Sequence, residues 1–215
     1  MKRIMSCLAC FLLVACQANP FAAHPTAKEK AASEQAELVK KARQVINQQL
    51  HKKEYPFQMM VDPMRGKRRF LGKQAGEDWS LKELPSRELV MQRKEERIYA
   101  YHRSKTEVMT TWQAGLVSPR DHLAFVLEMA KSYRKGPSIQ VNGQKADVIE
   151  VDIDEGKLLD KIKQTLFHDA AIALPDKMKV AYKLAVVRPH RLVRVTLLIQ
   201  APDREQVQQL TYEFI

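Results

Sequence analysis

The sequence predicts an α+β protein in which amphipathic helices pack on one face of a long antiparallel sheet. Two patterns support this fold class. Apolar residues recur every three or four positions in some segments and every second position in others, and turn residues separate the latter segments at short intervals. The chain has 215 residues, 45% of them hydrophobic and 28% charged. This balance suits one globular domain with a sizeable core.

The N-terminal residues form an export signal. Lys2 and Arg3 give a positive start, and the apolar run from Ile4 to Val14 follows. The run is shorter than the roughly 20 residues that span a bilayer, and its length is typical of a signal-peptide core. We therefore expect residues 1–15 to be a signal peptide.

The end of this signal matches a lipobox, the cleavage motif of bacterial lipoproteins. Residues 13–16 read Leu-Val-Ala-Cys, where a small side chain fits the peptidase and only a thiol can accept a diacylglycerol thioether. We expect cleavage before Cys16 and attachment of lipid, with acyl chains such as palmitate, to that residue. The alternative is an ordinary secretory signal in which Cys16 is incidental.

The mature chain carries one cysteine and a basic charge. Cys7 and Cys10 leave with the signal, so no disulfide, thiolate nucleophile or cysteine metal site is expected. The formal charge is +11, and loss of Lys2 and Arg3 leaves 34 basic against 25 acidic residues, or +9. On an exported protein this excess favours an anionic membrane surface over nucleic acid. A solvated basic surface without a partner is the alternative.

A flexible tether of residues 16–25, with two prolines, precedes a domain of residues 26–215. Thr26 and Glu29 form a possible capping box, which predicts a helix from Thr26 to about His51. One face of that helix is apolar and carries Leu38, Val39, Ala42, Val45, Ile46 and Leu50.

The apolar period then changes to two, which predicts a half-buried strand over Tyr55–Val61. Turn residues follow it, and a meander of further short strands is expected. These strands cover Lys67–Gly72, Glu88–Lys94, Arg97–His102 and Glu107–Gln113.

A second helix is predicted from Ser118, an N-cap residue followed by Pro119 in the first turn. Its apolar stripe runs through Tyr133, and Gly136-Pro137 is expected to stop it. Asn142-Gly143 is a strong hairpin signal, and it lies between the predicted strands Ser138–Val141 and Gln144–Ile153.

A third amphipathic helix is expected after Asp154, with Leu158, Leu159, Ile162 and Leu166 on one side. Three longer strands close the domain. They cover Lys177–Arg188, Arg191–Gln200 and Val207–Phe214, each with alternating apolar residues.

Catalytic motifs are absent from the sequence. The six histidines form no H-x-H or H-E-x-x-H pair, and no G-x-S-x-G or Gly-rich phosphate loop occurs. Residues 152–156 superficially resemble a calcium loop but lack its later ligands, and a strand end followed by a helix N-cap explains them better. We therefore expect no enzyme activity, no metal and no cofactor.

Large apolar side chains line several predicted strands, and a curved sheet with such a face can enclose a cavity for an acyl chain. The alternative is a face that the helices fill completely. The candidate ligand-binding residues are Phe57, Met59, Trp79, Tyr99, Tyr101 and Trp112.

Basic residues cluster beside two predicted turns. The first cluster contains Arg65, Lys67, Arg68 and Arg69, and the second contains Arg188, His190, Arg191 and Arg194. On a membrane-tethered domain such loops can contact anionic headgroups. Equally, they can be edge charges that prevent pairing between sheets.

The order of elements resembles that of the LolA-like and LppX-like lipoprotein-carrier superfamily. In similar lipoproteins, a segment like Phe70–Leu81 precedes strands like Glu88–Gln92 and Ile98–His102. Trp112 near the end of a strand, the helix from Ser118 and the ending Leu210-Thr211-Tyr212-Glu213-Phe214 also fit. The resemblance covers most of residues 30–215, but its motifs are patterns of strand and turn.

This resemblance implies an unclosed, curved antiparallel sheet, a half-barrel, packed with amphipathic helices. It also implies a non-enzymatic protein, since the superfamily comprises carriers, lipid binders and sensors. LolA itself is soluble, whereas Cys16 would anchor this chain. We expect a monomeric, extracytoplasmic lipoprotein, held to the cell membrane or to a Gram-negative outer membrane, that binds a lipid or a lipid-modified protein. A cell-envelope interaction or sensor module with a filled core is the alternative.

Overall fold

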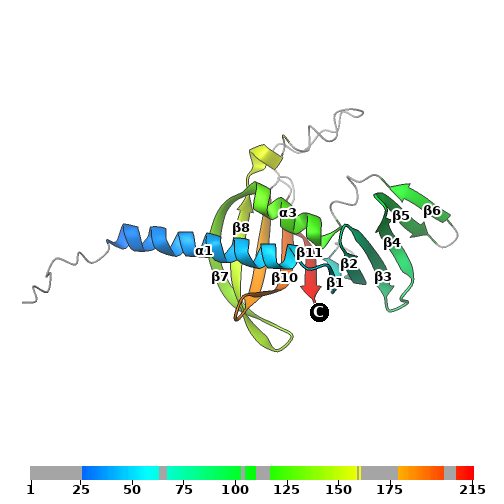
Figure 1. Ribbon diagram of the computed structural model, residues 1–215, viewed down its shortest axis with the longest axis horizontal. Helices are drawn as coiled ribbons and strands as arrows, with labels where there is room; N and C mark the ends of the chain where they lie inside the picture. The colour runs from blue at the N-terminus through cyan, green and yellow to red at the C-terminus, as the bar shows by residue number, and fades with distance from the viewer. Residues whose placement is uncertain are drawn as a thin grey trace, which may run out of the picture.

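The computed structural model describes residues 26–62, 67–102, 105–109, 117–158, 160, 179–200 and 207–215. Its centre is one antiparallel sheet of 11 strands in the order β6-β5-β4-β3-β2-β1-β11-β10-β9-β8-β7. Apart from the β1–β11 pair, every neighbouring pair in this order is also consecutive in the chain. Within the described residues β6 and β7 are the two edges, so the sheet is curved but unclosed (Figure 1). The predicted fold class is therefore confirmed.

Helix α1 (Ala27–Leu50) begins and ends where the sequence predicts. The Thr26 backbone N–H donates to Glu29 Oε2 at 2.7 Å, and the Glu29 backbone N–H donates to Thr26 Oγ1 at 3.3 Å. Ala42, Val45 and Ile46 are buried against the sheet. The first third of the helix is exposed and extends beyond the sheet (Figure 1).

The first half of the sheet is a meander that follows α1. Its strands are β1 (Glu54–Asp62), β2 (Arg68–Ala75), β3 (Asp78–Leu84), β4 (Leu89–Lys94), β5 (Arg97–His102) and β6 (Lys105–Met109). Strand β3 was not among the predicted strands. It has seven residues with only Trp79 and Leu81 as a buried alternating pair, a pattern too short to separate from a loop by periodicity.

The second helix is shorter than predicted, and the residues after it form a strand. Helix α3 covers Pro119–Met129, and β7 covers Ala130–Val141. The expected helical positions Ala130 and Tyr133 pair instead with Ile153 and Val151 of β8 (Gln144–Ile153). Tyr133 thereby becomes buried in the core. The long partner strand overrides the local helical pattern, so this part of the prediction was wrong.

The closing part of the sheet agrees with the sequence. Strands β9 (Lys179–Val187), β10 (Arg191–Gln200) and β11 (Val207–Phe214) lie next to one another, and β11 pairs with β1. Positive φ angles at Asn142 (50°) and Gly143 (75°) form the predicted hairpin turn. Residues 155–158 are helical, as expected after Asp154. Leu159, Ile162 and Leu166 of the same predicted helix lie outside the described residues.

The main core lies between the concave face of the sheet and the two helices. Ile46 of α1, Leu123 and Val126 of α3, and Leu184 and Val195 of the sheet are fully buried within it. Figure 1 shows α1 and α3 over the β7–β11 half, while β3–β6 extend to the side. No described helix is long and apolar enough to cross a membrane.

Candidate functional site

Three predicted ligand-binding residues lie together on the concave apolar face. Phe57 and Met59 of β1 and Trp79 of β3 are all buried and belong to the main core. Phe57 pairs with Gly72 of β2, which pairs in turn with Leu81 of β3. Since paired residues of antiparallel strands point to the same side, Leu81 shares this face.

Tyr99 and Tyr101 lie on the other side of the sheet. Leu81 pairs with Met91, and Met91 pairs with Ala100, so Ala100 is on the concave face. Tyr99 and Tyr101 flank Ala100 and therefore point to the convex face. The structure thus does not bring them together with the other three. Cys16 and Trp112 lie outside the described residues.

Buried aromatic and polar groups join the concave face to α3. His122 Nδ1 and the Tyr182 hydroxyl lie 2.7 Å apart and are buried, and the Tyr212 hydroxyl donates to the carbonyl of Val117 at 2.8 Å. Phe57 and Tyr212 make an edge contact with ring centroids 5.9 Å apart. Burial raises the pKa of both Tyr182 and Tyr212, so both hydroxyls stay protonated.

Arg120 of α3 connects three elements. Its Nη1 donates to the Leu50 carbonyl at the end of α1 at 2.7 Å, and its Nε donates to Glu77 Oε1 in the β2–β3 turn at 3.0 Å. A cation beside the terminal carbonyls of a helix is favoured by the helix dipole. This contact holds the end of α1 against the meander and so positions the residues that follow Leu50.

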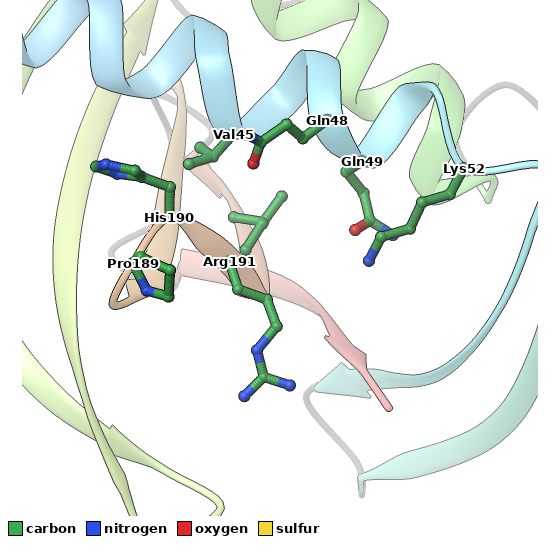
Figure 2. A pocket seen from close by; sticks show the side chains of 8 residues that line it. Val45, Gln48, Gln49, Lys52, Pro189, His190 and Arg191 are labelled. Atoms are coloured by element: carbon green, nitrogen blue, oxygen red, sulfur yellow. The ribbon is translucent and has the colours of Figure 1, made fainter.

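A pocket of about 310 Å³ lies between the C-terminal end of α1 and the turn from β9 to β10 (Figure 2). We call it the basic pocket. Its lining includes Val45, Gln49 and Lys52 on the helix side and His190, Arg191 and Leu192 on the turn side. Figure 2 shows the Gln49 amide and the end of Lys52 close together below α1. Apolar walls and three basic side chains therefore share one small space.

Only the turn side of this pocket was predicted from the sequence. His190 and Arg191 belong to the second predicted basic cluster, but Gln49 and Lys52 were not singled out as binding residues. The position of Gln49 indicates a buried polar side chain. Gln49 follows Val45 by four positions and Ile46 by three, so it falls on the apolar face of α1. A polar side chain at such a position is buried in the structure, at 2% exposure.

Ion pairs neutralise parts of both predicted basic clusters. Arg68 pairs with Glu83 at 2.8 Å and its guanidinium lies 5.2 Å from the ring centre of Phe70, whereas Arg194 pairs with Glu213. Arg65 lies outside the described residues. Within the second cluster, the uncompensated positive charge therefore concentrates around the β9–β10 turn.

Residues 152–156 form a strand end and a helix start. The Lys157 backbone N–H donates to Asp154 Oδ1 at 3.2 Å, which is an N-cap contact. Asp152 accepts from Ser132 at 2.7 Å and pairs with Arg134 at 3.0 Å. The N-cap interpretation is confirmed. Across the described residues, no three His, Cys, Asp or Glu side chains form a group that could hold a metal ion.

Comparison with known proteins supports the fold and nothing finer. No family model matches the sequence, and no curated protein is significantly similar to it. Among solved structures, the lipoprotein LppX of Mycobacterium tuberculosis is 8% identical with a TM-score of 0.54, over 84% of this chain and 94% of LppX. LprF of Mycobacterium bovis is 9% identical with a TM-score of 0.49, over 84% of this chain and 92% of LprF. The likeness to LppX and the unclosed, curved antiparallel sheet together show that the chain has an LppX-like half-barrel fold.

Proposed function

We propose that this protein is a non-enzymatic lipoprotein of the cell envelope that binds a lipid, or the lipid of a modified protein, on its concave face. The observation that carries the proposal is the apolar concave face of β3 and β5. Trp79, Leu81 and Ile98 lie on it. These side chains are buried in the present conformation, so an acyl chain would replace some of their contacts. LppX, which shares this fold, is itself a lipoprotein.

The membrane anchor is the second part of the proposal. Cleavage before Cys16 and acylation of its thiol would hold the domain on the extracytoplasmic side of a membrane. Residues 1–15 would then be absent from the mature chain. Replacement of Cys16 by Ala should release the protein from membranes. Continued retention of the variant in the membrane fraction would contradict the anchor.

Native mass spectrometry with lipid extraction tests lipid binding directly. The chain from Gln17 to Ile215 should be produced without its anchor in the periplasm of a heterologous host. A stoichiometric lipid that co-purifies supports the proposal, whereas a lipid-free mass together with no uptake of added lipids contradicts it.

Tryptophan fluorescence locates the acyl chain. The sequence has two tryptophans, so a Trp112→Phe variant reports on Trp79 alone. Lipids with brominated acyl chains should quench Trp79 strongly, because it lies on the proposed surface, and brominated headgroup analogues should not. Equal quenching by both would indicate unspecific contact.

A protein-interaction or sensor module is the second candidate. It is favoured by the packing of Ile46, Leu123 and Tyr182, each at most 2% exposed, between the helices and the β7–β11 half of the sheet. If the lipid experiments fail, a protein partner captured by crosslinking on the cell surface becomes the expected ligand.

A further inference from the structure

The basic pocket concentrates positive charge without compensation. Lys52 and Arg191 both line it, and in the described part of the chain neither forms an ion pair. Asp147 of β8, an acidic residue that faces α1, is paired with Lys41 at 3.2 Å. Arg191 Nη2 donates to Gln144 Oε1 at 2.8 Å, which fixes the guanidinium while leaving most of its N–H donors unused.

The two cations also disfavour each other. Burial lowers the pKa of Lys52, and the positive charge of Arg191 lowers it further. An anion between the two side chains would raise the pKa of Lys52 again. It would replace the water that burial removes from the ammonium group, and it would attract both Lys52 and Arg191.

A buried amide donor faces the same space. Gln49 is 2% exposed, and its Nε2 has no hydrogen-bond partner in the described structure. The Tyr55 hydroxyl is buried beside this amide. Burial raises the pKa of Tyr55 to about 12, against the opposing effects of the Arg120 charge and of the Gln49 side chain. An amide nitrogen has two N–H donors. The Tyr55 hydroxyl can accept from one of them, so at least one donor remains for an acceptor in the pocket.

We propose that the basic pocket binds a phosphate group, held by Lys52 and Arg191 and oriented by the Gln49 amide. Guanidinium and ammonium groups are the standard partners of phosphate oxygens in proteins. A volume of about 310 Å³ leaves room for a glycerol-sized substituent, and Val45 and Leu192 offer it apolar walls. The site is separate from the concave face around Trp79 and holds whether or not lipid binds there.

Calorimetry on the full-length chain carrying Cys16→Ala tests the site, with inorganic phosphate, glycerol 3-phosphate and vesicles of phosphatidylglycerol as probes. Lys52→Met and Arg191→Met should each weaken binding at least tenfold. Lys53→Met is the matched control, since Lys53 is an exposed neighbour outside the lining, and it should change binding less than twofold. Binding of the free phosphates assigns the site to a soluble compound, and binding of vesicles alone assigns it to a lipid headgroup.

Gln49→Glu separates binding from folding. The carboxylate would repel phosphate but pair with Lys52, so binding should be lost while the thermal midpoint stays equal or rises. Failure of all three probes to bind, or an equal loss with Lys53→Met, would overturn the proposal. So would unchanged affinity in Gln49→Glu.

Discussion

The ring of Phe57 lies directly on Gly72 of the neighbouring strand. A methyl group on the α-carbon of Gly72 would come within 2.2 Å of Phe57 Cζ and 2.3 Å of Cε2. Phe57 is fully buried and also contacts the ring of Tyr212. The absence of a side chain at residue 72 therefore lets an aromatic ring cover the strand at the centre of the concave face.

Gly72→Ala should accordingly destabilise the protein by about 1–3 kcal/mol, the usual cost of overpacking a filled core. Chemical denaturation measures the change. Gly156→Ala is the control, because a Cβ there meets only Asp154 Oδ1 at 3.4 Å. Combining Gly72→Ala with Phe57→Leu should recover part of the loss, and strictly additive effects would contradict the proposed contact.

Tyr182→Phe should lower the free energy of unfolding by about 1–2 kcal/mol, because it removes a buried hydrogen bond with His122. Tyr99→Phe provides a matched control on the convex face, where a change within about 0.5 kcal/mol is expected. Thermal unfolding followed by circular dichroism compares the two variants. Equal midpoints would mean that the His122–Tyr182 bond contributes nothing net.

Gly143→Ala should cost about 1 kcal/mol, because residue 143 has φ of +75° and side chains with a Cβ are strained there. Asn142→Gly should be nearly neutral, since glycine tolerates the +50° angle of that position. Urea denaturation distinguishes the two variants. An unchanged stability in Gly143→Ala would show that the hairpin can adopt another turn.

The ion pair between Lys41 of α1 and Asp147 of β8, at 3.2 Å, predicts a pH-dependent difference in stability. A hydrogen bond from Lys41, with the nearby positive charges, lowers the pKa of Asp147. The stabilisation is thus complete above the ordinary aspartate pKa of about 4 and is lost as the pH falls through the lower folded-state value.

Asp147→Asn should therefore be less stable than the wild type by about 0.2–1 kcal/mol at pH 7. The two proteins should converge in acid, as denaturation curves recorded from pH 7 down to about pH 2 can show. A difference that persists at the acid end would mean that the carboxylate acts through packing and not through its charge.

Many of the helices, strands and turns can be predicted from local sequence patterns. The capping residues Thr26 and Glu29, the apolar stripe of α1 and the Asn142-Gly143 turn each depend on neighbours within a few positions. Their effects on helix starts and hairpins are the same in most contexts. For that reason α1, β5, β8, β10 and β11 lie within one residue of their predicted bounds.

Long-range pairing decided what these patterns could not. Ala130 and Tyr133 continue the apolar stripe of the second predicted helix, but both pair with β8 and belong to a strand. The fit of a strand depends on its partner more than on its own composition. The same holds for the faces of the sheet, which separate Trp79 from Tyr99.

The sequence by itself determined the class of fold and most element bounds, because these follow from residue spacing and local chemistry. The tertiary structure alone decided which residues meet. Gln49 and Arg191 are far apart in the chain, and only the packing of α1 on the β9–β10 turn places them in one pocket. Contacts of this kind depend on how the whole sheet curves, a property that the spacing of residues along the chain does not encode.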